Sequence, residues 1–250
     1  MHKHLNQKNT EDRNLSIMKI FQMLKTALVR YGLWGTIAQG YDMFQIPIVE
    51  FFFDFIYRTD TRREENLDDL TIGSDNKERG VRYEPTKVLP LRKLFNYVRL
   101  RIPDDRILVD FGCGKGRVLL IASNFGFKEV RGVEFAHELC EIAKNNFAVY
   151  KHPTAIRTKF KIIESDVVDY IINPDENVFF MFNPFDEVIL SKIINNIATS
   201  LNIRPRRILI IYNRPKYSNV IEQQDKFIRL EECVFGGIRF ALYSNSGQIS

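Results

Sequence analysis

The stretch Val109-Asp110-Phe111-Gly112-Cys113-Gly114-Lys115-Gly116-Arg117 decides how this sequence is interpreted. It follows the apolar run Ile107 to Val109, which is typical of a buried strand, and it precedes a helical pattern over residues 118–125. The three glycines allow a tight turn and a close approach of the backbone to a ligand, and a helix N-terminus offers free N–H groups and a positive dipole. The stretch therefore predicts a strand, a loop that binds a nucleotide-like ligand, and a helix.

Outward from this loop, short apolar runs alternate with helical patterns. The alternation predicts a doubly wound α/β fold with a mostly parallel, seven-stranded sheet. A Gly236-Gly237 turn between two further apolar runs predicts a C-terminal antiparallel hairpin. The predicted strands cover residues 107–109, 130–133, 160–163, 178–182, 208–212, 227–235 and 238–244.

Ligands of such a sheet bind outside the carboxyl ends of its strands, so the residues after each run are candidates. Glu134 ends the second run, 18 residues after Gly116, where a carboxylate can accept hydrogen bonds from two ribose hydroxyls. The alternative for Glu134 is a solvated loop residue. The dinucleotide pattern Gly-x-Gly-x-x-Gly fails because Arg117 stands at its third glycine, which disfavours an NAD-dependent oxidoreductase.

The glycine loop resembles motif I of the class I S-adenosylmethionine-dependent methyltransferases, and Val109 to Gly116 match it throughout. This resemblance implies S-adenosylmethionine as the cofactor and a Rossmann-like methyltransferase fold. It also implies that Glu134 holds the ribose and that Asp166 meets the adenine amino group, although Asp166 also suits the N-cap of a helix. The methionine part would be held by Asp110, Gly112, Cys113, Gly114 and Gly116.

The fourth run ends in Asn183-Pro184-Phe185, which resembles the Asn-Pro-Pro-Tyr motif of amino-group methyltransferases but lacks one proline and has Phe in place of Tyr. The resemblance suggests a catalytic role for Asn183, which would orient a nitrogen acceptor beside the cofactor, and for Phe185, which would cover it. Asn183 is also a candidate cofactor-binding residue. The alternative is a turn that only ends the strand. A nitrogen of a protein side chain is the favoured acceptor, with nucleic acid and small molecules as alternatives.

Upstream, Gly80-Val81-Arg82-Tyr83-Glu84-Pro85-Thr86 precedes a helical pattern over residues 88–98. With the glycine loop, it resembles an uncharacterised bacterial group of class I methyltransferases that carry a helical N-terminal extension. This resemblance implies that Tyr83, Glu84 and Thr86 lie over the cofactor, whereas the alternative is a turn that begins the helix. The predicted division is an extension with a charged linker over 1–80 and a methyltransferase domain over 81–250.

Within the extension, the spacing of apolar residues from Ile17 to Leu28 predicts an amphipathic helix. Residues 33–57 are rich in aromatics, but polar residues interrupt every window of the ~20 residues that a membrane span needs. We expect this segment to cap the domain, and a peripheral membrane contact is the alternative. A further alternative is a non-catalytic domain whose aromatic extension docks on a protein or a membrane.

Composition argues against several other kinds of function. The net charge of +5 is too small and too scattered to indicate nucleic-acid binding. The three cysteines have no Cys-x-x-Cys spacing and the four histidines no metal-site spacing, so no disulfide framework and no metal is expected. These features favour a reducing, cytoplasmic location.

Overall fold

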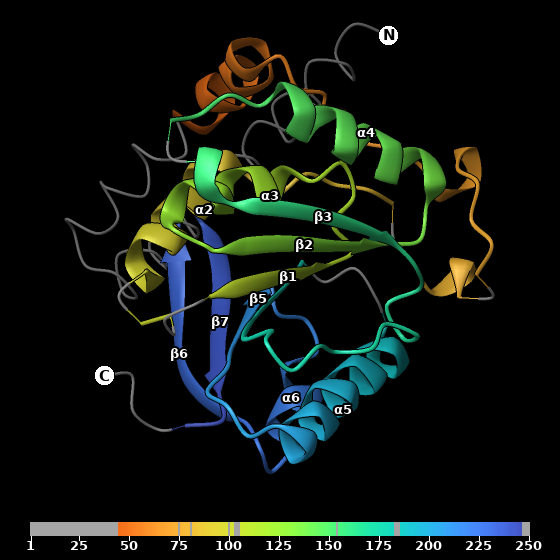
Figure 1. Ribbon diagram of the computed structural model, residues 1–250, viewed down its shortest axis with the longest axis vertical. Coiled ribbons are helices and arrows are strands. Elements are labelled where there is room, and N and C mark those ends of the chain that lie inside the picture. The colour runs from red at the N-terminus through yellow and green to blue at the C-terminus, as the bar shows by residue number, and fades with distance from the viewer. Residues whose placement is uncertain are drawn as a thin grey trace, which may run out of the picture. The chain divides into compact units, whose positions relative to one another are not determined.

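The computed structural model describes residues 45–74, 76–80, 82–99, 101–102, 106–153, 155–182 and 186–246. The chain divides into two compact units, residues 1–45 and 46–250, and the labelled elements of Figure 1 belong to the second. The boundary expected between residues 80 and 81 falls inside this second unit. The helix predicted from Ile17 and the aromatic stretch over 33–44 lie outside the described residues.

A seven-stranded sheet forms the centre of the second unit, in the order β3-β2-β1-β4-β5-β7-β6 (Figure 1). The first five strands of this order are parallel, and β7 runs antiparallel to both β5 and β6. The predicted doubly wound α/β fold with a C-terminal hairpin is therefore confirmed. The strands are β1 (Ile107–Phe111), β2 (Glu129–Glu134), β3 (Lys159–Glu164), β4 (Val178–Met181), β5 (Leu209–Asn213), β6 (Ile228–Phe235) and β7 (Ile238–Ser244).

Helices cover both faces of the sheet, which explains why β1, β4 and β5 are apolar runs rather than alternating ones. One core lies between the sheet and α2 with α3, and the other between the sheet and α5 with α6. The helices are α2 (Val88–Val98), α3 (Arg117–Ala122), α4 (His137–Val149), α5 (Glu187–Ile203) and α6 (Ser218–Glu222), with short 3-10 turns at η1 (Leu67–Asp69), η2 (Lys77–Arg79), η3 (Ser123–Phe125) and η4 (Ala155–Arg157).

The turn of the C-terminal hairpin has its predicted chemistry. Gly236 and Gly237 both have positive φ angles, 55° and 76°, which the two central residues of a type I′ turn require. The short helix α6 before the hairpin was not predicted, because it buries only Ile221 and so has no apolar period to detect.

Residues 45–57 form a further helix, which we call the N-terminal helix. It packs across the beginnings of α2 and α3: Glu50 accepts a hydrogen bond from the backbone N–H of Val88, and Phe53 is buried in the core of that face. No helix among the described residues has the length and apolarity to cross a bilayer.

Residues 58–86 connect the N-terminal helix to α2, and we call this segment the strap. Its part from 60 to 80 was expected to be a linker with little to bury. In the structure it runs along the carboxyl edge of the sheet, where Ile72 pairs with Ala136 just after β2 through an isolated bridge. A second isolated bridge, between Glu65 and Tyr83, joins two parts of the strap itself. Polar side chains at the loop ends hold it there, a type of contact that leaves no apolar pattern in a sequence.

Candidate functional site

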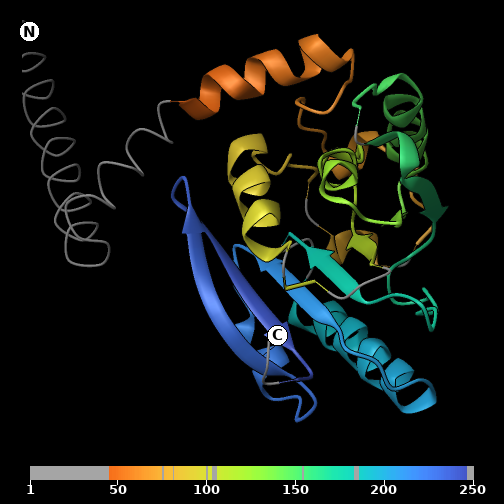
Figure 2. The ribbon, with the colours of Figure 1, turned by 60° about the vertical axis from the view of Figure 1, so that its left-hand side comes forward.

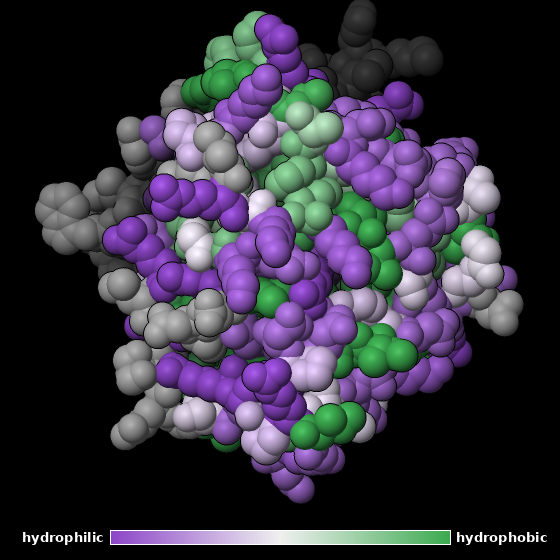
Figure 3. Space-filling model, viewed as in Figure 1, coloured by the Kyte–Doolittle hydropathy of each residue, from purple (hydrophilic) through white to green (hydrophobic). Residues whose placement is uncertain are grey.

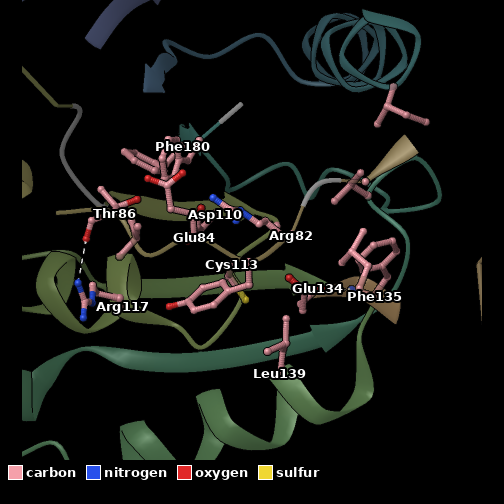
Figure 4. Close-up of a pocket in the computed structure, with 18 of the residues that line it drawn as sticks. Arg82, Glu84, Thr86, Asp110, Cys113, Arg117, Glu134, Phe135, Leu139 and Phe180 are labelled. Carbon is pink, nitrogen blue, oxygen red and sulfur yellow. Dashed lines mark hydrogen bonds between the residues drawn. The ribbon is translucent and has the colours of Figure 1, made fainter. Parts of the chain in front are cut away.

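A cavity of about 510 Å³ opens at the carboxyl edge of β1, β2 and β4, between the glycine loop and the strap (Figure 4). This volume is typical of a small-molecule or cofactor site. Its polar lining comes from the strand ends, the glycine loop and the strap. These residues are Asn76, Arg82, Tyr83, Glu84, Thr86, Asp110, Gly112, Cys113, Arg117, Glu134, Asp166 and Arg214.

The glycine loop folds back against the end of β2. The backbone N–H groups of Gly112 and Cys113 both donate to the carbonyl oxygen of Val133, at 2.9 and 3.2 Å. Gly114 has a φ of 51°, and a Cβ atom there would lie 2.2 Å from the ring of Tyr83. Glycine is thus required at 114 both for its conformation and for the close approach of the strap. Gly116, with a φ of 81°, is the N-cap of α3.

The side chain of Cys113 lies against Gly132 of β2, where a Cβ atom would come within 2.4 Å of its sulfur. Burial raises the pKa of the Cys113 thiol well above its usual range, and the nearby carboxyls of Glu134 and Asp110 add to this rise. The protonated thiol is a small side chain in the wall of the cavity and no nucleophile.

Glu134 ties the end of β2 to the glycine loop. Its Oε1 accepts from the N–H groups of Phe135 and Ala136, both at 3.0 Å, and its Oε2 accepts from the N–H of Gly114 at 2.9 Å. Burial raises its pKa, and these three donors oppose part of the rise. A carboxylate has about four acceptor positions. Glu134 therefore keeps one, on Oε2, for a ligand in the cavity.

Asp110, on β1, is 2% exposed, and its Oδ2 has no hydrogen-bond partner among the described residues. Burial, together with the charge of Glu134, raises its pKa well above the usual value. A buried carboxylate without a donor is costly, because it loses its hydration without compensation. A cationic ligand group in the cavity would satisfy it.

Asp166, in the turn after β3, is already hydrogen-bonded. Its Oδ2 accepts from the hydroxyl of Ser74 and, at 2.8 Å, from the amide of Asn76, while its Oδ1 accepts from the N–H of Val168 at 3.0 Å. Burial alone would raise the pKa of Asp166, but these hydrogen bonds lower it. The carboxylate thus fastens the strap to the sheet and also lines the cavity.

The three strap residues expected over the cofactor all line the cavity. Tyr83 donates its hydroxyl hydrogen to the carbonyl of Thr61 at 2.8 Å, and burial raises the pKa of this phenol. Glu84 accepts from Arg214 at 2.8 Å. The carbonyl of Thr86 accepts from Arg117 at 3.3 Å, the contact marked by a dashed line in Figure 4.

In the sequence, Arg117 was notable only because it stands where the dinucleotide pattern has its third glycine. In the structure it is 1% exposed, donates to Glu50 and, at 2.7 Å, to the hydroxyl of Thr61, and lies 3.9 Å from a carboxylate oxygen of Asp54. Its guanidinium also lies 5.6 Å from the ring centroid of Phe53. The side chain that breaks the dinucleotide pattern therefore anchors the N-terminal helix.

Lys115 has a similar structural role. Its ammonium is fully buried and pairs with Glu65 at 2.9 Å and Asp60 at 3.3 Å, both on the strap. The two cations of the glycine loop thus fasten the N-terminal helix and the strap. The only sequence signal was their place in the motif, since their partners lie 50 or more residues away along the chain.

The end of β5 adds two features on the face of the sheet that carries Asp110. Arg214 has a positive φ of 49° and lies 5.0 Å from the ring centroid of Phe182, at the mouth of the cavity. The adjacent Asn213 is 1% exposed, and neither atom of its amide has a partner among the described residues. A non-glycine residue with positive φ beside an unsatisfied buried amide is typical of a functional edge.

Two expected site residues cannot be compared with the structure. Asn183 and Phe185, predicted to act on the acceptor, lie outside the described residues together with Pro184. Within the described part of the chain, no group of three or more His, Cys, Asp or Glu side chains has the arrangement of a metal site.

No protein-family model matches the sequence, and no curated protein matches it. Solved structures do resemble it. The yhhF protein of Escherichia coli is 19% identical with a TM-score of 0.49, and the match covers 63% of this chain and 87% of that one. The ribosomal protein L11 methylase of Lactobacillus delbrueckii is 16% identical with a TM-score of 0.44, over 61% and 76% of the two chains.

A third similar structure is the magnesium protoporphyrin IX methyltransferase of Synechocystis, which was solved with bound S-adenosylmethionine. It is 14% identical with a TM-score of 0.46, over 62% of this chain and 79% of that one. The doubly wound sheet with helices on both faces is Rossmann-like. At these identities and TM-scores, the function of the chain has to follow from its own residues.

Proposed function

We propose that this chain is an S-adenosylmethionine-dependent methyltransferase and that it binds its cofactor in the cavity at the glycine loop. The observation that carries the proposal is the unpartnered Oδ2 of Asp110, buried at the wall of a cavity large enough for a nucleoside. The methionine part of the cofactor bears an ammonium group, which is the kind of partner that a buried carboxylate lacks.

The other polar groups of the cavity fit the same ligand. The free acceptor position of Glu134 suits a ribose hydroxyl, and Asp166 keeps an acceptor position on Oδ1 for an exocyclic amine. Four carboxylates line the cavity, and one of them, Glu84, is paired with Arg214. The other three, Asp110, Glu134 and Asp166, favour a ligand with cationic and hydroxyl groups over a polyphosphate. This balance supports S-adenosylmethionine over NAD.

When bound, the cofactor supplies an electrophilic methyl group on a sulfonium. The chain's own residues have to hold the acceptor in line with that group and keep water away, because displacement depends on alignment. Phe180 and Phe182 at the end of β4 give the cavity an apolar wall on the acceptor side. Asn183 and Phe185, which follow them directly, are proposed to orient the acceptor.

We further propose that the acceptor is a nitrogen of a protein side chain. Each arginine that lines the cavity is paired with a carboxylate: Arg82 with Glu64, Arg117 with Glu50 and Arg214 with Glu84. A nucleic-acid backbone would have to compete with these carboxylates for every contact, whereas a peptide of mixed charge would not. The paired arginines therefore favour a protein acceptor.

Calorimetric titration of the full chain with S-adenosylmethionine, S-adenosylhomocysteine and NAD tests the cofactor. We expect micromolar binding of the first two and none of NAD. Asp110→Asn keeps the shape of the side chain but removes its charge, so we expect roughly tenfold weaker binding or worse. Asp225→Asn, on an exposed residue far along the chain, is the control. Full affinity in Asp110→Asn would contradict the assignment.

The acceptor requires a separate measurement. Cell extract treated with protease, with nuclease or with neither is incubated with the chain and S-adenosylmethionine that carries a labelled methyl group. A label that protease pretreatment abolishes supports the protein acceptor. A label that only nuclease abolishes, or one that survives both treatments, would show instead that the acceptor is nucleic acid or a small molecule.

A further inference from the structure

The N-terminal helix carries apolar side chains on two sides. Its inward face packs Val49, Phe53 and Tyr57 on the core of the domain and also carries the carboxylates of Glu50 and Asp54, which meet Arg117. Its outward face carries an apolar stripe with the spacing i, i+3, i+4, i+7, i+8. We call Ile48, Phe51, Phe52, Phe55 and Ile56 the outer stripe, and their exposed fractions are 49, 56, 46, 76 and 63%.

A surface helix of a globular protein normally turns such a stripe toward the core. Figure 2 shows the helix in orange along the outside of the domain, next to α2, and in Figure 3 apolar side chains gather at the top edge, where Figure 1 draws the same helix. Other strongly exposed apolar residues, such as Ile171 and Ile203, stand on separate elements. Exposed apolar residues that form one stripe mark an interaction surface.

Three exposed arginines and one exposed glutamate, Glu64, follow the outer stripe in the sequence. Arg63 lies 3.8 Å from Glu65, and Glu64 lies 3.5 Å from Arg82. The guanidinium of Arg62 lies 5.5 Å from the ring centroid of Phe51, and Arg58 and Arg63 are exposed nearby in sequence. The carboxylates of the helix point inward, and Asp60 is bound to Lys115. The stripe therefore combines phenylalanine and isoleucine side chains with an arginine rim.

We propose that the outer stripe docks on the surface of an anionic lipid bilayer, with the N-terminal helix lying in the plane of the interface. Apolar side chains would enter the boundary between headgroups and acyl chains, while Arg58, Arg62 and Arg63 would meet the lipid phosphates. This docking is independent of the proposed methyl transfer, because it involves no residue of the cavity wall.

The size of the stripe also favours a lipid surface over a second copy of the chain. A large aromatic side chain offers roughly 150–250 Å², so five half-exposed to three-quarters-exposed side chains present an area on the order of 500 Å². A stable protein interface needs about 800 Å² from each partner. An interfacial helix needs no such area, because anionic lipids add an electrostatic attraction to the apolar contact.

Flotation of the full chain with vesicles tests the docking. We expect the chain to float with vesicles that contain phosphatidylcholine and phosphatidylglycerol, and to float much less with phosphatidylcholine alone. Phe55→Ser combined with Ile56→Ser should reduce the bound fraction roughly tenfold or more, because the two most exposed side chains of the outer stripe are lost. Ile171→Ser combined with Ile203→Ser removes two still more exposed side chains elsewhere and should leave flotation unchanged.

A second experiment replaces arginines beside the outer stripe and leaves the five residues of the stripe unchanged. Arg62→Gln combined with Arg63→Gln should weaken binding to the anionic vesicles, and a rise in salt should weaken wild-type binding in the same way. Absence of wild-type flotation, or equal flotation of the Phe55→Ser, Ile56→Ser variant, would overturn the proposal. So would analytical ultracentrifugation that finds a dimer which this variant turns into a monomer, because the stripe would then be a subunit interface.

Discussion

The two ends of the glycine loop differ in how their buried charges are compensated. At the first end, Asp110 has an unpartnered oxygen, and Glu134 beside it has an acceptor position to spare. At the other end, Lys115 and Arg117 are equally buried but meet several carboxylates from the strap and the N-terminal helix. The Nη2 of Arg117 has no hydrogen bond among the described residues, but its charge is compensated by Asp54, 3.9 Å away. The uncompensated end has the properties of a binding site, and the compensated end has those of a structural joint.

This difference separates residues that the motif places side by side. A motif match does not distinguish ligand-binding residues of the loop from structural ones. Burial and hydrogen bonding do distinguish them. A buried polar group that already has hydrogen-bond partners gains little free energy from a ligand, whereas one that lacks partners gains much. Substitutions at the two ends should therefore alter different measured quantities.

The largest effect is expected at the structural end. Arg117→Ala would leave Glu50 buried without its partner, and we expect the free energy of unfolding to fall by about 3–5 kcal/mol. Urea denaturation measures this loss. Arg63→Ala, on a side chain that is 82% exposed, is the matched control and should change it by less than about 0.5 kcal/mol. A loss below about 1 kcal/mol for Arg117→Ala would end the distinction between the two ends.

At the binding end, Glu134→Ala should mainly lower affinity. We expect a loss of about 1–3 kcal/mol in the binding free energy of S-adenosylmethionine, measured by calorimetry, because the ribose loses a charged acceptor. The conservative Glu134→Gln keeps one carbonyl oxygen and should lose less. The two variants would sharpen the comparison, since equal losses would mean that the contact with Gly114 matters rather than the contact with the ligand.

The pH dependence of stability offers a test without ligand. The folded state raises the pKa of Asp110, so this group favours folding below its unfolded pKa, about 4, and that contribution is lost as the pH rises through the folded pKa. Asp110→Asn removes this titration. Relative to wild type, the variant should gain stability steadily from about pH 4 upward, as measured by thermal melts across pH. A constant difference would show that the carboxyl is compensated after all.

The smallest effect concerns the strap. Asn76→Ala removes one of two side-chain donors to Asp166, and we expect a loss of about 0.5–1.5 kcal/mol in unfolding free energy. Because Asp166 has a lowered pKa, its contribution is present at neutral pH and is lost as the pH falls through the folded value. Urea melts of Asn76→Ala and wild type should therefore differ at pH 7 and converge in acid. A difference that persists in acid would contradict this role.

Much of the fold was predictable, because β1, β4 and β5 are largely apolar, β2 and β3 hold apolar residues between charged ones, and β6 and β7 form a hairpin with a glycine turn. The cavity was partly predictable for a topological reason: the strands that precede Asp110, Glu134 and Asp166 are parallel, so their carboxyl ends meet at one edge. Asn213 was missed, because nothing in its neighbourhood distinguishes it from any polar residue that ends a strand.

The sequence led us to expect a cap on the domain in residues 33–57, but it did not show the contacts that place the strap and the N-terminal helix. Besides the buried Phe53, these are polar contacts between residues far apart in the chain, such as Arg117 with Glu50 and Asn76 with Asp166. A sequence shows apolar periodicity, which reports on burial against any core, but it does not show which carboxylate meets which guanidinium. One such pairing, between Arg117 and Glu50, fixes which side of the N-terminal helix faces the domain.

By itself, the sequence determined the α/β alternation, the glycine loop and the acid after the second strand, since these depend on local periodicity and on the backbone freedom of glycine. Only the tertiary structure decided which charged groups of the loop are satisfied. That outcome depends on partners brought from 50 or more residues away, and it distinguishes the binding end of the loop from its structural end.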